Sequence, residues 1–257
     1  MGMLENKIIF ITGATAGIGK ACAFDFAHEG ANLILCARRI QKLEILADQI
    51  KKDFGIKIYH FQLDVRDKFA VKETIDSLPD EWKEIDILVN NAGLARGFSK
   101  LDNGEIEDWE EMIDTNVKGL LYITRQVLPL MAARNQGHII NIGSVAGHEV
   151  YPNGNVYCAT KFAVDALSKG IRLDMLDKKI KVTTIAPGLV ETEFSEVRFT
   201  GDKERAKQVY KGFKPLVAAD ISKLVLFAAT RPQHVNINEI VVTPTAQGSS
   251  TQVLRES

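Results

Sequence analysis

Short apolar runs alternate along the chain with longer stretches of mixed polarity. The apolar runs cover residues 7–11, 31–37, 57–63, 85–89, 138–143, 180–186 and 239–242. They are rich in Ile, Leu and Val and lack the strict alternation of a strand with one wet face. A run of this kind is typical of a strand buried on both faces of a parallel sheet. The pattern therefore predicts seven strands.

Most of the stretches between these runs have helical spacing. It predicts helices over residues 20–29, 41–54, 108–131, about 154–178 and 219–230, with one more after Arg66. Residues 189–215 are charged and irregular, and we interpret them as a mobile lid at the carboxyl end of a strand. Because strands and helices alternate with no linker-like segment, we expect an α/β fold, one domain over residues 1–257 with a doubly wound parallel sheet.

Composition narrows the class of protein. A chain of 257 residues with 46% hydrophobic residues can bury a large core. A net charge of -1 provides no broad positive field, so we expect no nucleic-acid partner. The three cysteines are an odd number without a Cys-x-x-Cys or a His cluster, which argues against disulfides and against a metal site.

No segment of the sequence predicts a membrane anchor. The apolar residues 8–11 are too few for a signal peptide or a membrane span. Gly2 fails the myristoylation pattern because Asn6 stands where Ser or Thr is needed. Together with the unpaired cysteines, this predicts a cytoplasmic protein with no membrane partner.

A glycine-rich turn joins the first predicted strand to the first predicted helix. It reads Thr12-Gly13-x-x-x-Gly17-x-Gly19, and this placement between strand and helix is the context of a dinucleotide site. Gly13 would allow the tight turn, Gly17 the close approach of a pyrophosphate, and Gly19 close packing of helix on strand. The spacing is wider than the common Gly-x-Gly-x-x-Gly, so the placement carries the interpretation.

Two arginines end the second predicted strand. Arg38 and Arg39 stand where an NAD site would have an acid to accept from the ribose hydroxyl, and no acid is present there. An arginine at this point suits a 2′-phosphate and predicts NADP. The alternative is that both side chains only meet solvent.

Polar residues also follow the third and fourth predicted strands. Asp64 could accept from an adenine amino group or cap the next helix. Asn90-Asn91-Ala92-Gly93 provides amides and a glycine where ligands of open α/β sheets bind, although a simple turn would use the same residues.

Tyr157 and Lys161 stand one helical turn apart, on the same face of a predicted helix. An ammonium within a few ångströms favours the phenolate, so Lys161 is expected to lower the pKa of Tyr157. Ser144 ends the preceding strand, and its hydroxyl and that of Tyr157 can converge on one substrate oxygen. Asn116, inside a predicted helix, needs a hydrogen-bond partner if buried, and a purely structural amide remains open for it.

These residues, in this order, resemble the short-chain dehydrogenase/reductase family over almost the whole chain. The matching motifs are the glycine-rich turn, Asn90-Asn91-Ala92-Gly93, Asn116, Ser144, Tyr157-x-x-x-Lys161 and Pro187-Gly188-x-x-x-Thr192. The resemblance implies a Rossmann fold with strand order 3-2-1-4-5-6-7, a nicotinamide cofactor and a homotetramer built through the helices that contain Asn116 and Tyr157.

The resemblance also implies roles for the site residues. Ser144 would hold the substrate oxygen, Tyr157 exchange its proton, Lys161 lower the Tyr157 pKa and bind the nicotinamide ribose, and Asn116 hold a water that relays protons. The implied cofactor site consists of Gly13, Thr15, Gly17, Ile18, Gly19, Arg38, Arg39, Asp64, Val65, Asn91, Ala92, Gly93, Tyr157, Lys161, Pro187, Gly188, Val190 and Thr192. Ala16 departs from the basic residue of many NADP-using members, so the 2′-phosphate would rely on Arg38 and Arg39, with help from Thr15.

Within the family, the chain is similar to NADP-dependent 3-hydroxy acid dehydrogenases acting on serine and L-allo-threonine. This implies a small hydroxy acid substrate, bound by Ser144, Tyr157 and a cation for its carboxylate. Arg198 in the lid is the first choice for that cation and Arg96 the second, while Arg198 could instead pair with Glu193 or Glu196. The alternatives are a 3-ketoacyl, sugar-alcohol or carbonyl reductase, and a cofactor-sensing protein, although a sensor usually has a broken catalytic set.

Overall fold

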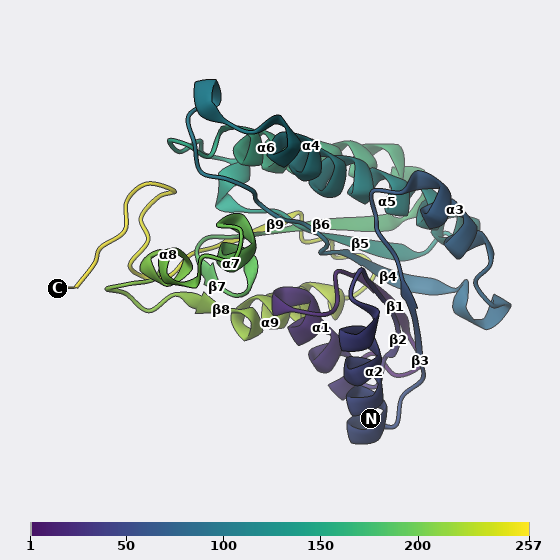
Figure 1. Ribbon diagram of the computed structural model, residues 1–257. Helices are drawn as coiled ribbons and strands as arrows, with labels where there is room; N and C mark the ends of the chain where they lie inside the picture. The colour runs from purple at the N-terminus through teal and green to yellow at the C-terminus, as the bar shows by residue number, and fades with distance from the viewer. Residues whose placement is uncertain (1, 257) are drawn as a thin grey trace.

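The structure, a computed structural model, describes residues 2–256 and contains a seven-stranded parallel sheet covered by helices on both faces (Figure 1). The strand order is β3-β2-β1-β4-β5-β6-β9. Because β9 is the seventh strand of this sheet, the order matches the predicted 3-2-1-4-5-6-7. The predicted fold class is confirmed.

The main elements follow the predicted alternation. The strands are β1 Ile8–Thr12, β2 Asn32–Ala37, β3 Ile58–Gln62, β4 Ile85–Asn90, β5 Gly137–Ile142, β6 Ile180–Pro187, β7 Val190–Glu191, β8 Leu216–Val217 and β9 Glu239–Val242. The α-helices are α1 Gly17–His28, α2 Ile40–Phe54, α3 Lys68–Asp76, α4 Ile106–Ile113, α5 Leu120–Ala133, α6 Asn155–Asp174, α7 Phe194–Arg198, α8 Lys203–Gln208 and α9 Ala218–Ala229. Short 3-10 turns cover Asp80–Trp82, Leu101–Asn103, Val145–Gly147 and Leu176–Lys178.

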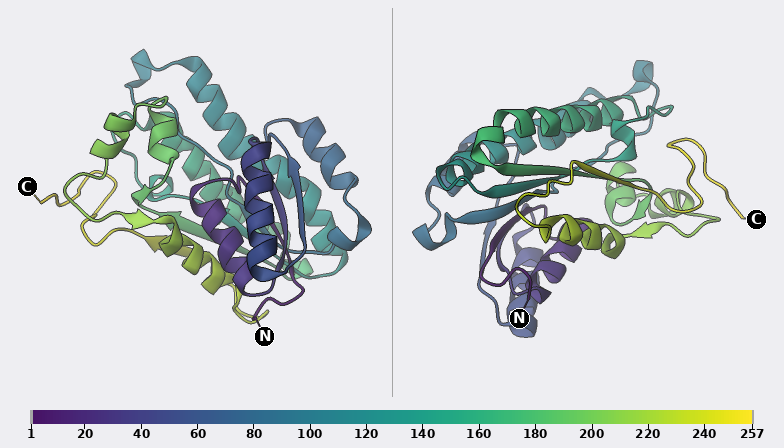
Figure 2. Two further views of the ribbon diagram at one scale, coloured as in Figure 1. Left: turned by 60° about the horizontal axis from the view of Figure 1, so that its bottom comes forward. Right: turned by 180° about the vertical axis from the view of Figure 1, so that it is seen from behind.

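Burial on both faces explains why the strands are continuously apolar. In β1, Ile9 and Ile11 pack into one core cluster, whereas Ile8 and Phe10 pack into another on the opposite face. Helices α1, α2 and α9 cover the first face, and α3, α4, α5 and α6 cover the second (Figures 1 and 2). Each successive side chain of such a strand therefore enters a core.

The chain reverses its winding direction between β1 and β4. β1 pairs in parallel with β2 on one side and with β4 on the other. Ligands of open α/β sheets bind outside the carboxyl ends of the strands at such a switch point. The segments after β1, β2, β4, β5 and β6 carry the predicted site residues, and all five strand ends lie at this edge.

The helix predicted over residues 108–131 has a different internal structure. It begins earlier, as α4 at Ile106, and changes at Asp114 into a π-helical segment that ends at Gly119, before α5 continues to Ala133. A π turn contains an extra residue relative to an α turn, and such segments concentrate at functional sites. Asn116 lies inside it, buried.

The expectation that residues 189–215 are irregular is wrong. This segment, which we call the lid, contains β7 and the short helices α7 and α8, and β7 pairs with β8 just beyond it. Both helices are too short to give a clear helical period in the sequence. Asp202 caps α8 by accepting from the Arg205 N–H.

The helix after Arg66 begins at Lys68, and its cap is not Asp64. Asp67 accepts from the N–H groups of Phe69 and Ala70 and caps α3. The Asp64 carboxylate binds Arg66 instead.

No helix among the described residues is both long and apolar enough to cross a membrane.

Candidate active site

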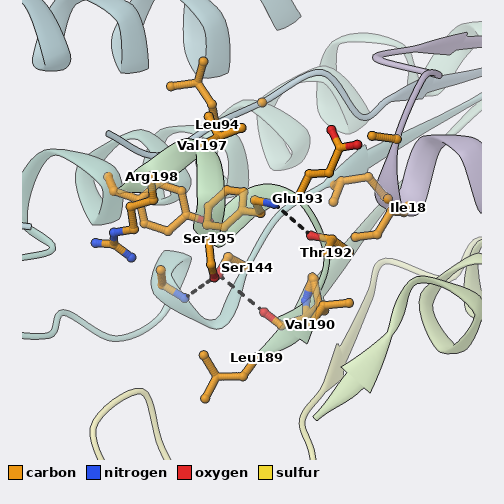
Figure 3. A pocket seen from close by; sticks show the side chains of 18 of the residues that line it. Ile18, Leu94, Ser144, Leu189, Val190, Thr192, Glu193, Ser195, Val197 and Arg198 are labelled. Carbon is orange, nitrogen blue, oxygen red and sulfur yellow. Dashed lines mark hydrogen bonds between the residues drawn. The ribbon is translucent and has the colours of Figure 1, made fainter. Parts of the chain in front are cut away.

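A cleft of about 820 Å³ lies at the carboxyl edge of the sheet (Figure 3). It brings together nearly all of the predicted site residues, from the glycine-rich turn to the lid. Only Gly19 and Asn116 of that set do not line it. Arg38, Arg39, Lys161, Arg198, Arg205 and Arg255 line the cleft against the two carboxylates Asp64 and Glu193. This excess of positive charge suits anionic ligands.

The glycine-rich turn is built for close approach of a ligand to the backbone. Gly17 has a φ of 49°, a left-handed conformation that favours glycine. A Cβ on Gly19 would lie 2.4 Å from the Asn91 amide nitrogen. The α1 helix has no side-chain cap at Ala16, so the N–H groups of its first turn stay available for an anion, as a dinucleotide pyrophosphate requires.

Asn91 holds this turn against the end of β4. Its side-chain amide donates to the carbonyl oxygens of Thr12 and Gly13, at 2.9 and 3.1 Å. The Thr12 hydroxyl in turn accepts from the N–H groups of Asn91 and Ala92. Asn91, which the sequence predicts for the cofactor site, thus fixes the shape of the glycine-rich turn through these bonds.

Arg38 and Arg39, the two arginines predicted to bind the 2′-phosphate, both line the cleft. Each also bonds to another side chain, so neither contacts solvent alone. Arg39 donates through Nε and Nη2 to the Thr15 hydroxyl and through Nη1 to Glu193, at 2.8 Å. Arg38 donates to Glu111 at 3.3 Å. Thr15 and Glu193 therefore orient the Arg39 guanidinium before any phosphate binds, whereas Arg38 is held only by its long contact with Glu111.

Ser144, Tyr157 and Lys161 line the cleft together, and all three are buried. The Ser144 hydroxyl accepts from the Ala146 N–H at 3.1 Å and donates to the Pro187 carbonyl at 3.4 Å (Figure 3). Lys161 donates to the Ile142 carbonyl at 2.9 Å, and its ammonium lies 5.9 Å from the centre of the Tyr157 ring. The helical spacing thus brings the pair together as predicted.

The pKa of Tyr157 differs from expectation. Burial raises it above the ordinary value and Tyr151 adds to the shift, while the Ser144 hydroxyl and the Arg198 guanidinium oppose it without reversing it. Burial also lowers the pKa of Lys161 to about 8. The net shift is upward in this arrangement because desolvation of both groups disfavours their charged forms, and the part of Lys161 in the ionisation of Tyr157 stays a prediction.

Asn116 anchors the loop after β4. Its amide oxygen accepts from the Leu94 N–H at 2.8 Å, and its amide nitrogen donates to the Leu94 carbonyl at 2.8 Å and to Thr160 at 3.0 Å. Asn116 therefore has the structural role that the sequence analysis left as an alternative. These bonds tie the segment that follows Gly93 to the α6 helix that carries Tyr157 and Lys161.

Arg198 projects from the end of α7 beside Tyr157. Its guanidinium carbon lies 5.6 Å from the Tyr157 ring centre and 4.8 Å from that of Phe98. Its hydrogen bonds go to the Tyr151 hydroxyl and the Gly97 carbonyl, both neutral. It does not pair with Glu193, which binds Arg39 and Lys42.

Arg96, the second candidate for binding the substrate carboxylate, already donates to Glu111 at 2.6 Å.

Several residues that no sequence pattern indicated also shape the cleft. Phe98, Tyr151, Phe194 and Tyr210 supply aromatic walls, and Gln247, Ser250, Thr251 and Val253 come from the C-terminal tail. Tyr151 and Phe98 sit in loops at strand ends, which is the one signal that could have found them.

Comparison with known proteins identifies the class of protein. Residues 7–203 match the family model described as short chain dehydrogenase. The chain belongs to this family, and the predicted resemblance is confirmed.

Individual members of the family are similar to this chain over nearly its full length. An NADP-dependent 3-hydroxy acid dehydrogenase of Schizosaccharomyces pombe is 44% identical over 257 residues, covering 100% of this chain and 99% of that protein. The NADP-dependent 3-hydroxy acid dehydrogenase YdfG of Escherichia coli K12 is 48% identical over 241 residues, with 93% and 96% covered.

Solved structures agree with these sequence relatives. The closed form of serine dehydrogenase complexed with NADP+ superimposes with a TM-score of 0.90 at 45% identity, covering 97% of this chain and 100% of that one. Serine dehydrogenase from Escherichia coli gives a TM-score of 0.80 at 43% identity, with 94% and 99% covered.

The bonds of Asn116 predict a stability effect. Asn116→Ala would leave the buried N–H and carbonyl of Leu94 without partners, at about 1–3 kcal/mol for each group. We expect the free energy of unfolding in urea to fall by roughly 2–4 kcal/mol. The control is Asn103→Ala, because Asn103 is exposed and its side chain makes no hydrogen bond within residues 2–256. Equal effects of the two substitutions would show that Asn116 does not hold the loop.

Proposed function

We propose that the protein is an NADP-dependent oxidoreductase that oxidises short 3-hydroxy acids, such as L-serine, L-allo-threonine or 3-hydroxypropionate, at the 3-hydroxyl. The observation that carries this proposal is Arg198, a cation beside Tyr157 with no acidic partner among the described residues. A carboxylate in a partly dry site needs such a group. The full-length relatives named for this reaction add support.

The cleft residues fit NADP in particular. The uncapped start of α1 and the close packing at Gly19 suit the pyrophosphate, and Arg38, Arg39 and Thr15 suit the 2′-phosphate. Asp64 lines the same end of the cleft, where it can meet the adenine. When bound, NADP supplies the acceptor for the hydride that leaves carbon 3.

The chain's own residues perform the proton transfer and the positioning. The Ser144 hydroxyl holds the substrate oxygen, and Tyr157, in its phenolate form, accepts the proton of the 3-hydroxyl as the carbonyl forms. Lys161, fixed by the Ile142 carbonyl, places an ammonium beside Tyr157 and is available to the nicotinamide ribose. Arg198 binds the carboxylate, and the lid, residues 189–215, covers the substrate.

We also propose a homotetramer in the cytoplasm. Apolar side chains stay exposed on the helices expected to form the interface, namely Ile113, Leu121, Phe162 and Leu173. The cysteines are three buried free thiols, which fits a reducing compartment. Sedimentation equilibrium measures the assembly directly.

The cofactor preference depends on Arg38 and Arg39. Charge-assisted bonds contribute about 1.5–3 kcal/mol each, so Arg38→Ala with Arg39→Ala should lower kcat/KM for NADP by at least about 100-fold. Steady-state kinetics with NAD serve as the internal control and should change little. An unaltered NADP preference in the double variant, or a wild type that prefers NAD, would contradict the assignment.

The acid–base role belongs to Tyr157. Tyr157→Phe should abolish hydride transfer yet retain NADP affinity, measured by fluorescence titration, because only the proton exchange is lost. Since burial raises the Tyr157 pKa, kcat/KM for alcohol oxidation by the wild type should rise with pH from about 7 to about 10. Near-normal turnover by a folded Tyr157→Phe variant would rule the mechanism out.

Arg198 is expected to set the substrate class. Arg198→Met should raise KM for 3-hydroxy acids at least about tenfold, equivalent to about 1.4 kcal/mol, and leave an uncharged alcohol of equal size little affected. The matched control is Lys203→Met on α8, which removes an exposed lid cation that does not line the cleft. Equal losses on charged and uncharged alcohols would point to lid closure instead, and no activity on any 3-hydroxy acid would exclude the substrate class.

A further inference from the structure

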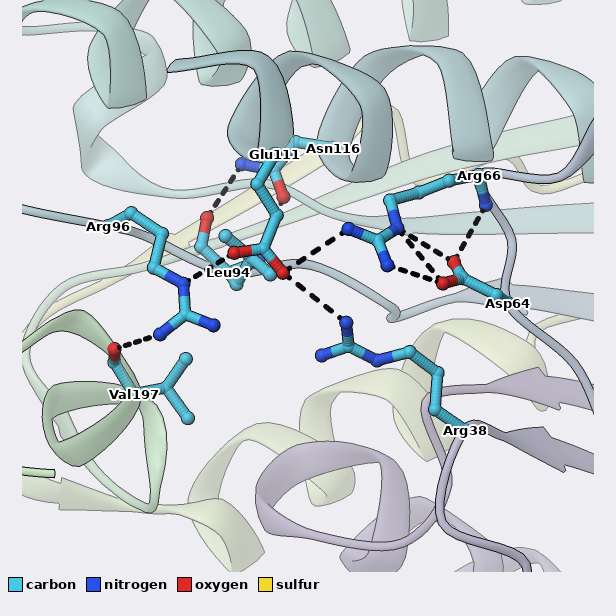
Figure 4. Close-up of polar contacts among 8 residues, drawn as sticks. All are labelled: Arg38, Asp64, Arg66, Leu94, Arg96, Glu111, Asn116 and Val197. Atoms are coloured by element: carbon cyan, nitrogen blue, oxygen red, sulfur yellow. Dashed lines mark hydrogen bonds and ion pairs between the residues drawn. The ribbon is translucent and has the colours of Figure 1, made fainter. Parts of the chain in front are cut away.

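Glu111 joins four segments of the chain that are far apart in the sequence (Figure 4). It lies near the end of α4, and its carboxylate accepts from three guanidinium groups. Arg96 donates at 2.6 Å, Arg38 at 3.3 Å and Arg66 at 3.4 Å. These arginines come from the loop after β4, the end of β2 and the loop before α3.

Arg96 is the main partner of this carboxylate. Arg66 already has its own carboxylate, Asp64, at 2.6 Å. The Arg38 side chain is half exposed and its contact is long, which makes it a weak bond. The Arg96 side chain is 23% exposed and that of Glu111 18%, and their bond is short. Although burial alone would raise the pKa of Glu111, its bonds to Arg96 and Arg38 hold that pKa below the usual value.

Arg96 also holds the lid. Its Nη1 donates to the Val197 carbonyl at 2.8 Å, at the end of α7. Next to this bond, Gly97 and Arg198 exchange two more, from the Gly97 N–H to the Arg198 carbonyl and from Arg198 Nε to the Gly97 carbonyl. The Arg96 guanidinium therefore spans from Glu111 on α4 to the C-terminal turn of α7.

The α7 helix cannot fix its own position. It has five residues, far fewer than the number at which a helix is stable in water by itself. The amides that follow the helix bond to its last turn, and the carbonyls of Val197 and Arg198 also accept from outside the lid, from Arg96 Nη1 and from the Gly97 N–H. Any loss of order at Arg96 passes directly to the side chain that faces Tyr157.

We propose that Glu111 is a positioning residue, which acts through Arg96 to hold the α7 helix so that Arg198 faces the carboxylate of the substrate. Neither Glu111 nor Arg96 lines the deep cleft, and both act at a distance from the reacting atoms. The kinetic test of this inference rests on the proposed function, because it uses a 3-hydroxy acid as substrate. The structural test measures the order of the lid and does not depend on the proposed function.

The kinetic test compares Glu111→Gln with Glu110→Gln. Glu110 precedes Glu111 on the same helix, is exposed, and makes no side-chain hydrogen bond within residues 2–256. The Glu110→Gln substitution therefore removes the same charge without affecting Arg96. Glu111→Gln should raise KM for a 3-hydroxy acid about fivefold, equivalent to about 1 kcal/mol, with kcat and NADP affinity within about twofold of wild type. Glu110→Gln should match the wild type in all three.

Non-additivity tests the route through Arg96. If Glu111 acts on the lid only through this side chain, Arg96→Met and the double variant Arg96→Met with Glu111→Gln should have the same KM. Arg96→Lys provides a variant that keeps the charge and can stand in if Glu111→Gln fails to fold. An ammonium lacks the planar fork that reaches Glu111 and Val197 together, so the same rise in KM is expected.

Hydrogen exchange of the lid gives the readout that needs no substrate. The amides of Phe199, Thr200 and Gly201 bond back into α7 and report on its order. They should exchange faster in Glu111→Gln than in Glu110→Gln. Equal exchange in these two variants overturns the inference, as does a loss of NADP affinity as large as the rise in KM, which would place the effect at Arg38 and the cofactor instead of at the lid. A wild type inactive on every 3-hydroxy acid defeats the proposed function instead, and leaves the exchange result to decide on Glu111.

Discussion

The rest of the structure depends on the parallel pairing of β1 with two neighbours, β2 on one side and β4 on the other. Parallel strands place all of their carboxyl ends at one edge, and the reversal at β1 opens that edge between the two halves. The glycine-rich turn, the arginine pair and the loop after β4 follow these three strands. The turn is then held to the β4 end by two hydrogen bonds, one from the Asn91 amide to the Thr12 carbonyl and one from the Ala92 N–H to the Thr12 hydroxyl.

The sequence predicts the sheet and most of the cleft because both follow from local patterns. A strand buried on both faces must be apolar throughout, so β1, β2 and β4 are visible as short runs. Once the strands are placed, topology brings Arg39, Ser144 and Tyr157 to one edge, although they are far apart along the chain. The resemblance to a family then assigns roles that periodicity alone leaves open.

Other features depend on tertiary contacts that no local pattern contains. Arg96 and Val197 are 101 residues apart, and Arg198 and Tyr151 are 47 apart. The same holds for the ionisation of Tyr157, since helical spacing reveals the neighbouring ammonium but not the extent of burial that raises the pKa of Tyr157. Short helices such as α7 escape prediction because neighbouring elements, more than their own sequence, hold them in shape.

The π-helical segment at Asp114–Gly119 accommodates an extra residue between α4 and α5. Each residue of an α-helix turns the chain by about 100°, so an extra residue without a local adjustment would rotate everything that follows. The π turn absorbs that residue, and Ile123, Val127 and Met131 of α5 still face the core. Deleting one residue of the segment would restore regular α-helical bonding and keep this apolar stripe in the core, so its effect would be confined to the turn that holds Asn116. The π-helical segment therefore alters the helix locally, around Asn116, without changing how α5 packs.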